Sequence, residues 1–224
     1  MAWISLSYVL DETTFSYGNG GGPQFEPLNA ISNGDSANVT AIRTHSHIGT
    51  HVDFPKHFLD DAATGDTYAT DRFVFNQPAC IDIEEGCAMV TISELEKGMV
   101  DIELSSETDF LIMRTGLWKC RNDDRFWNDY PGIAAETAAW LRERLPSLKA
   151  IGLDTISLSS WNNRAEGRIS HREYLGRDIW IVEDMDLSAV SAQTQFRQLI
   201  LAPMLFRKCD GAPSFILADV KPAG

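Results

Sequence analysis

The sequence lacks cysteines at the spacing of a metal finger or a redox motif. Its four cysteines, Cys80, Cys87, Cys120 and Cys209, are scattered and none belongs to a C-x-x-C pair. This scatter argues against a disulfide framework and against a metal held by thiolates. We therefore expect free thiols in a reducing compartment.

Long apolar runs and clusters of positive charge are also absent. No stretch approaches the ~20 apolar residues that cross a bilayer, and Met1–Leu10 has neither region of a signal peptide. The chain has 32 acidic and 19 basic residues, a formal net charge of −13, and no local Lys/Arg cluster. Such a chain repels phosphate backbones and acidic membrane surfaces. We predict a cytoplasmic protein with neither nucleic acid nor membrane as a partner.

What is present fits an ordinary globular chain. The 224 residues are 44% hydrophobic and 23% charged, which indicates neither disorder nor a repeat array. A chain of this length buries roughly 70% of its unfolded surface. We expect one domain spanning residues 1–224.

Short β-rich segments outnumber helical ones. Strands are predicted at Trp3–Leu10, Ala79–Ile83, Phe110–Thr115, Lys149–Asp154, Ile179–Glu183, and near Gln198–Leu205 and Ser214–Val220. Helices are predicted at Thr91–Glu96 and Ala134–Leu145. This mixture predicts an α/β fold with a mixed sheet.

The glycine-rich segment Tyr17–Pro23 is predicted to be a loop. It lacks the Gly-Lys-Ser/Thr ending of a phosphate-binding loop. It is either a mobile surface loop or a lid whose aromatic residue, Phe15 or Tyr17, closes on a substrate ring.

Four of the five histidines lie within the thirteen residues His45–His57. Imidazoles beside Asp53, with no cysteine nearby, are typical of a catalytic zinc or manganese site. In an extended strand, His47 and His51 would lie about 13 Å apart. The backbone must therefore fold back between them, through one helical turn or a bend at Gly49.

Pro55 follows this cluster and restricts φ, so it should end any helix there. His57 would then leave on a rigid segment a few residues beyond the predicted ligands. That position suits a base beside a metal.

A second group of candidate ligands lies late in the chain. Glu183 ends an apolar strand and shares a face with Ile179 and Ile181. A buried carboxylate needs a positive neighbour, which could be a metal ion or an arginine such as Arg114, unless Glu183 caps the following segment. His171, twelve residues earlier, is either a satisfied polar residue or a further ligand.

The stretch His47–His57 resembles the signature His-x-Gly-Thr-His-x-Asp-x-Pro-x-His of the cyclase-like metal-dependent hydrolases, which include bacterial kynurenine formamidase and isatin hydrolase. Further similarities occur at Arg114-Thr115-Gly116, Gly152–Ser157, His171-Arg172, Leu175, Ile181-Val182-Glu183 and Gly211-Ala212-Pro213. The resemblance spans essentially the whole chain. It implies a swivelling β/β/α fold assembled as a homodimer or homotetramer.

The resemblance also implies a set of metal ligands. His47, His51 and Asp53 would hold a first ion, with Asp53 able to bridge to a second. His171 and Glu183 would complete the binuclear site. The implied cofactor is Zn²⁺, as one or two ions, with Mn²⁺ as the alternative.

The implied chemistry is hydrolysis. A divalent ion lowers the pKa of bound water from 15.7 to about 7 and polarises a neighbouring carbonyl. His57 would be the general acid/base that accepts a proton and returns it to the leaving amine.

The expected substrate is a small aromatic amide, with cleavage of N-formylkynurenine to kynurenine and formate as the leading hypothesis. One alternative is opening of a cyclic amide or lactone, as in isatin hydrolysis. A different class of function is a metal-binding interaction module without catalysis, although an inert site has no need of His57.

Tyr17 matches the place of a tryptophan that contacts the substrate ring in the formamidases. The chain departs from the family pattern at Ser159 and at Asp184-Met185, and these changes leave the predicted ligands intact. The aromatic wall of the site has four candidate residues, each of which could instead be a plain core residue: Tyr17, Phe58, Trp118 and Trp161.

Overall fold

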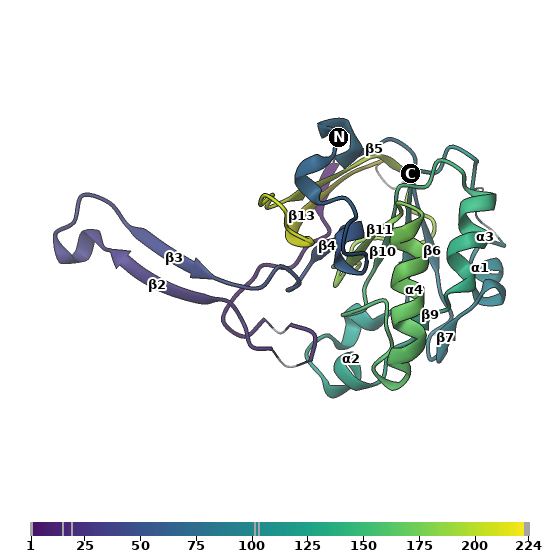
Figure 1. Ribbon diagram of the computed structural model, residues 1–224, viewed down its shortest axis with the longest axis horizontal. Coiled ribbons are helices and arrows are strands. Elements are labelled where there is room, and N and C mark those ends of the chain that lie inside the picture. Colours follow the sequence, from purple (N-terminus) through teal and green to yellow (C-terminus); the bar gives the residue numbers. More distant parts are fainter. Residues whose placement is uncertain (1, 15, 19, 101, 103, 222–224) are drawn as a thin grey trace.

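The fold is built around a long mixed sheet (Figure 1). The computed structural model describes residues 2–14, 16–18, 20–100, 102 and 104–221. Within these residues the strand order is β5-β12-β13-β4-β11-β10-β8-β6, and β1 also pairs with β13. The strands of this sheet are β1 (Ala2–Ser5), β4 (His51–Asp53), β5 (Val74–Phe75), β6 (Pro78–Asp82), β8 (Phe110–Arg114), β10 (Ala150–Leu153), β11 (Trp180–Glu183), β12 (Phe196–Pro203) and β13 (Gly211–Val220).

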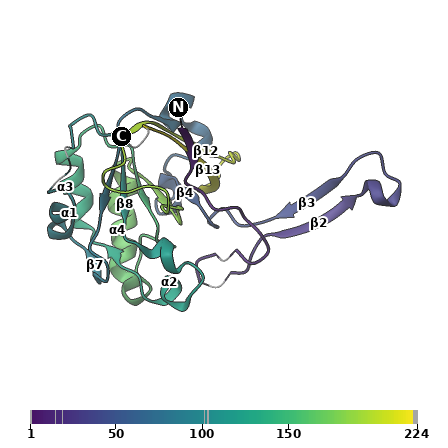
Figure 2. The same ribbon diagram turned by 180° about the vertical axis from the view of Figure 1, so that it is seen from behind.

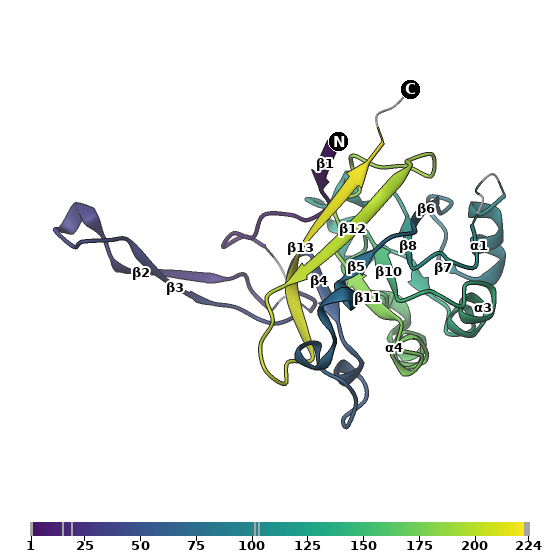
Figure 3. The same ribbon diagram turned by 90° about the horizontal axis from the view of Figure 1, so that it is seen from above.

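The sheet changes character where β4 meets β11. Strands β6, β8, β10 and β11 are parallel, whereas β4 is antiparallel to both β11 and β13. Parallel neighbours need crossover connections. These contain α1 (Ile92–Gly98), α2 (Asp124–Asn128), α3 (Glu136–Arg144) and α4 (Arg164–Gly176). Figure 3 shows α1, α3 and α4 on the same side of the parallel strands.

Alternation along the strands divides the core into two layers. In β8, Leu111 and Met113 belong to the cluster that packs under the helices. Phe110 and Ile112 belong to the cluster enclosed by the antiparallel half of the sheet. Because successive side chains point to opposite faces, Glu183 shares the helix-covered face with its neighbour Ile181.

The predicted α/β fold with a mixed sheet is confirmed, and most elements start or end within a few residues of their predicted bounds. The strand predicted at Trp3–Leu10 is too long. It ends at Ser5, and Ser7 instead makes an isolated bridge to Met185. Phe15 lies outside the described residues.

The sequence did not predict α4, although this helix has 13 residues. Glycines at 167 and 176 are poor helix formers, and they interrupt its pattern. A small sheet of β7 (Met89–Val90) and β9 (Gly132–Ile133) was also not predicted.

A hairpin of β2 (Gln24–Asn29) and β3 (Val39–Arg43) projects from the body of the molecule (Figures 1 and 2). It forms a sheet of its own, and we call it the arm. Its exposed apolar side chains are Phe25, Leu28, Ile31, Val39 and Ile42. Both faces of the arm are exposed, so its strands lack the alternation of a half-buried strand.

None of the helices in the described part of the chain combines the length and apolar character that a membrane crossing requires.

Candidate metal centre

A bend at Gly49 begins the site. Gly49 has a φ of 54°, in the left-handed region that glycine adopts without strain. The chain therefore turns sharply, and His51 opens β4. The structure realises the bend rather than the helical turn. Thr50 secures it, since its hydroxyl donates to the carbonyl of Asp184 at 2.5 Å and accepts from the amide of Tyr8 at 3.1 Å.

Pro55 starts a helical turn and does not end one. It is the first residue of a 3₁₀ turn, Pro55–His57. A proline fits there because the first amide of a helix has no intrahelical partner. The expected rigid segment therefore curls back toward the ligands, and His57 Nε2 lies 4.0 Å from Asp53 Oδ2.

Strand register places Glu183 against the early cluster. Glu183 lies directly opposite His51 in the antiparallel β4–β11 pair, and His51 Nε2 is 3.4 Å from Glu183 Oε2. The arginine alternative does not hold, because Arg114 pairs with Asp82 at 2.8 Å. Glu183 also accepts a 2.6 Å hydrogen bond from the amide of Leu158.

Helix α4 adds His171 to the same cluster. His171 Nε2 lies 3.4 Å from Glu183 Oε1 and 3.7 Å from Asp53 Oδ2. Its Nδ1 is 2.8 Å from the carbonyl of Gly167, the preceding turn of the helix. His51 Nδ1 likewise lies 2.8 Å from the carbonyl of Gly49. Nδ1–H donation to a carbonyl leaves the Nε2 lone pair of each ring free to bind a cation.

His47 and His57 form the more open side of the cluster with Asp210. The same oxygen of Asp210, Oδ2, lies 2.8 Å from His47 Nε2 and 3.0 Å from His57 Nδ1. His47 Nδ1 is 2.7 Å from Asp53 Oδ1. The two imidazoles pack with their centroids 3.9 Å apart. Gly211 makes room for this, since a Cβ there would lie 2.5 Å from His47 Cε1.

Asp210 was not predicted from the sequence. It precedes the Gly211-Ala212-Pro213 segment, and it is an acidic residue in a chain with many others. Its only sequence signal is its place immediately before a strand. Only the tertiary structure brings Asp210 next to His47 and His57, which lie about 150 positions earlier in the chain.

Opposite charges dominate the electrostatics of the cluster. Burial opposes a charge on His47, but the carboxylates of Asp53 and Asp210 outweigh it and raise its pKa to about 10. Burial and Asp53 both disfavour a charge on Glu183, but His171 and His51 prevail and lower its pKa to about 2. Hydrogen bonds from His47 and His57 hold the pKa of Asp210 well below its usual range.

The donor set fits a divalent cation. Asp53 is fully buried, yet its Oδ2 has no hydrogen-bond partner among the described residues. His51 Nε2 lies 3.5 Å from Asp53 Oδ1, longer than a good hydrogen bond. Ligands about 2.1 Å from a tetrahedral ion are separated by about 3.4 Å. Two groups have ligand atoms close enough to share an ion: His51, Asp53 and Glu183, and His47, Asp53 and His57.

The cluster faces a cavity of about 430 Å³. Tyr17 and Phe58 line it, as do Arg164 and Arg168. Phe58 stacks on His171 with ring centroids 4.3 Å apart, so it also positions a candidate ligand.

The other two aromatic candidates are placed differently. Trp161 is not among the lining residues of this cavity, but its ring lies 5.5 Å from that of Tyr17. Trp118 lies away from the cavity. It lies beside Arg114 and packs against the core cluster enclosed by the antiparallel half of the sheet.

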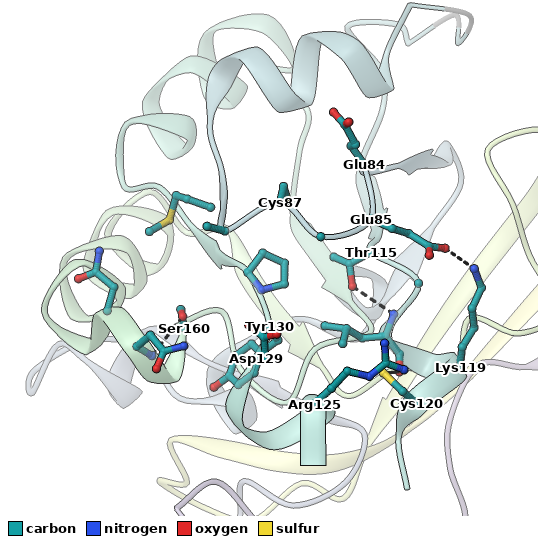
Figure 4. Close-up of a pocket in the computed structure, with 18 residues that line it drawn as sticks. Glu84, Glu85, Cys87, Thr115, Lys119, Cys120, Arg125, Asp129, Tyr130 and Ser160 are labelled. Carbon is teal, nitrogen blue, oxygen red and sulfur yellow. Dashed lines mark hydrogen bonds and ion pairs between the residues drawn. The ribbon is translucent and has the colours of Figure 1, made fainter. Parts of the chain in front are cut away.

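A second cavity, of about 440 Å³, has different chemistry (Figure 4). Its wall includes Cys87, Cys120 and an ion pair between Lys119 and Glu85. No histidine is among its lining residues. The imidazole cluster therefore remains the candidate centre.

Comparison with known proteins identifies the family of the chain. The Cyclase family model, described as "Putative cyclase", matches residues 4–160, more than half of the chain. The chain belongs to the cyclase family. The predicted resemblance is thereby confirmed, and the matched residues include the segment that contains His47, His51, Asp53 and His57.

Relatives of this cyclase-family chain include enzymes. Cyclase-like protein 1 of Arabidopsis thaliana is 31% identical over 222 residues, which cover 94% of this chain and 81% of that protein. Kynurenine formamidase of Bacillus cytotoxicus is 24% identical over 220 residues, covering 98% and 97%. Isatin hydrolase A from Labrenzia aggregata shares the fold, with a TM-score of 0.80 at 20% identity over 97% of this chain and 93% of that one.

Proposed function

We propose that this cyclase-family protein is a metal-dependent hydrolase of a small aromatic amide, with arylformamidase activity. In the leading case, N-formylkynurenine and water give kynurenine and formate. The formyl C–N bond breaks, the hydroxyl of water goes to the formyl carbon, and a proton goes to the amine nitrogen. The convergence of four imidazoles and two buried carboxylates beside one cavity supports this proposal.

The proposed cofactor is Zn²⁺, as one or two ions, with Mn²⁺ as the alternative. His51, His171, Glu183 and Asp53 would hold it on the buried side, and His47 on the open side. When bound, a divalent cation would supply Lewis acidity, favouring ionisation of water and polarising a substrate carbonyl.

His57 is the proposed proton carrier. Asp210 accepts from its Nδ1, which holds the ring with Nε2 toward the ligands. A carboxylate that orients an imidazole in this way is a recurring feature of catalytic bases. The same contact argues against a module that only binds metal, because ligand retention does not require an oriented base.

Tyr17 and Phe58 are proposed to contact the aromatic ring of the substrate. Both line the cavity beside the ligands, and aromatic side chains supply large apolar surfaces for a ring. Trp161 would act through its contact with Tyr17.

Opening of a cyclic amide such as isatin is the second candidate, and the shared fold with isatin hydrolase A supports it. Steady-state assays of metal-loaded protein on N-formylkynurenine and on isatin distinguish the two candidate functions. We expect kcat/KM to be higher for N-formylkynurenine. Higher kcat/KM for isatin would favour the second candidate, and no turnover of either substrate, or of a panel of amides and lactones, would favour the non-catalytic module.

A further inference from the structure

Two arginines lie on the face of α4 that carries His171. Positions 164, 168 and 171 are spaced by four and three residues, so their side chains share one side of the helix. Arg164, Arg168 and His171 all line the same cavity. At 1.5 Å per residue, Arg168 lies about 4.5 Å and Arg164 about 10.5 Å along the axis from His171.

Neither guanidinium has a carboxylate partner among the described residues. Arg121 pairs with Asp184 and Arg72 with Asp178, whereas Arg43, Arg144 and Arg172 have no ion pair among the described residues. Arg164 and Arg168 differ from these unpaired arginines because they line the cavity that the histidine cluster faces. Among the described residues, Glu183 is the only carboxylate in the wall of this cavity, and His51 and His171 contact it.

Aromatic rings orient one of the two arginines. The guanidinium carbon of Arg164 lies 5.1 Å from the ring centre of Trp161 and 5.8 Å from that of Tyr17. Cation–π contacts of this kind hold a guanidinium plane in place without consuming its hydrogen-bond donors. Its donors remain available to a ligand.

We propose that Arg164 and Arg168 form an anion subsite, so that the substrate of this enzyme is an aromatic amide bearing a carboxylate. This rests on the proposed function, whose leading substrate, N-formylkynurenine, carries a carboxylate, and it assigns the residues that would recognise that group. A guanidinium fork matches the geometry of a carboxylate and binds it through two hydrogen bonds. The formyl group would lie at the histidine cluster, and the carboxylate would lie toward the N-terminus of α4.

Paired substrates test the subsite. N-formylanthranilate carries a ring carboxylate, and formanilide is the same formamide without it. We expect the Arg164→Gln/Arg168→Gln double variant to lose about ten- to a hundredfold in kcat/KM on N-formylanthranilate, mostly through KM, because hydrogen bonds to charged groups contribute on that scale. Its kcat/KM on formanilide should stay within about twofold of the parent value.

Arg172 provides the matched control. It is exposed on the same helix, has no ion pair among the described residues, and is not part of the cavity wall. Arg172→Gln should leave both substrates unchanged. Equal losses on both substrates, or an Arg172→Gln effect as large as that of the double variant, would overturn the subsite.

A binding measurement distinguishes failure of the subsite from failure of the proposed hydrolysis. Titration of metal-loaded protein with 2-aminobenzoate should show binding that the double variant weakens about tenfold or more and Arg172→Gln does not. If neither of these formamides nor N-formylkynurenine is turned over but this pattern holds, the amide hydrolase proposal fails and the anion subsite stands. If all three proteins bind 2-aminobenzoate equally, the subsite is wrong whatever the activity.

Discussion

The two sides of the candidate metal centre contain similar residues but differ in burial and in the contacts that hold them. On the deep side, the side chains of His51, His171 and Glu183 are 3–5% exposed, and both imidazoles contact backbone carbonyls. On the open side, those of His47, His57 and Asp210 are 20–37% exposed, and one carboxylate contacts both imidazoles.

This difference separates retention of a cation from transfer of a proton. Backbone carbonyls of a strand turn and a helix cannot move without disturbing the fold, so the deep side has a fixed geometry. Asp210 is a surface carboxylate before β13, and the imidazoles that it contacts face the cavity. We therefore expect substitutions on the deep side to affect metal content, and substitutions of His57 and Asp210 on the open side to affect turnover.

The largest effect should come from Asp53, which contacts both sides. Asp53→Ala should lose at least one equivalent of metal and more than about a hundredfold in activity, since even outer partners of ligands contribute ten- to a hundredfold. Elemental analysis of the purified variant measures the metal content. Asp60→Ala, at a fully exposed carboxylate, is the control, and full metal content in Asp53→Ala would contradict the bridging role.

The next effect should come from His57. His57→Ala should keep its metal and lose about 10²- to 10⁴-fold in kcat, the usual contribution of a general acid/base. Metal content and kcat are measured on the same preparation. Loss of the ion in this variant would identify His57 as a ligand and remove the distinction between the two sides.

Asp210 should have a smaller effect of the same kind. Asp210→Ala removes the carboxylate that orients His57, and we expect kcat to fall about ten- to a hundredfold with the metal retained. Steady-state kinetics measure kcat, and elemental analysis measures the metal content of the same variant. An unchanged kcat would show that His57 is held in position by other contacts.

The stability of the metal-free protein should depend on pH through His47. Its folded pKa of about 10 lies above the ordinary value of about 6.5, so its pairing stabilises the fold fully below pH 6.5. This contribution is lost as pH rises toward 10. Thermal unfolding in chelator should show a smaller loss in His47→Gln than in the parent protein, because the pKa values of His51 and His171 are also raised and keep part of the dependence. Superimposable pH profiles of the two proteins would contradict the assignment.

The arm should have the smallest effect on the chemistry. The expected homodimer or homotetramer remains a prediction, and the exposed apolar side chains of the arm are where a second copy could contact it, because an isolated two-stranded hairpin is only marginally stable. Leu28→Asp/Ile42→Asp should reduce the mass measured by light scattering. Val9→Asp, at a residue 91% exposed outside the arm, should not. An unchanged mass in the double variant would exclude the arm from assembly.

The arm and α4 also show where local pattern fails as a predictor. The arm strands have no buried face, and the apolar residues of α4 are interrupted by glycines. Gly167 is required there because a Cβ would lie 2.1 Å from Ser159 Oγ. The close packing of α4 against Ser159 therefore requires a glycine, and this glycine weakens the helical pattern of the sequence around His171.

The sequence alone predicted the early candidate site residues, because residues a few positions apart come together once the chain bends between them. His47, His51, Asp53 and His57 are of this kind, and Gly49 specifies the bend between them. Only the tertiary structure decided which distant residues join them. The strand register places Glu183 opposite His51. The packing of α4 places His171, Arg164 and Arg168 beside the cavity, and the turn before β13 places Asp210 next to His47 and His57. Contacts of this kind depend on how separate elements pack, and no local pattern encodes that.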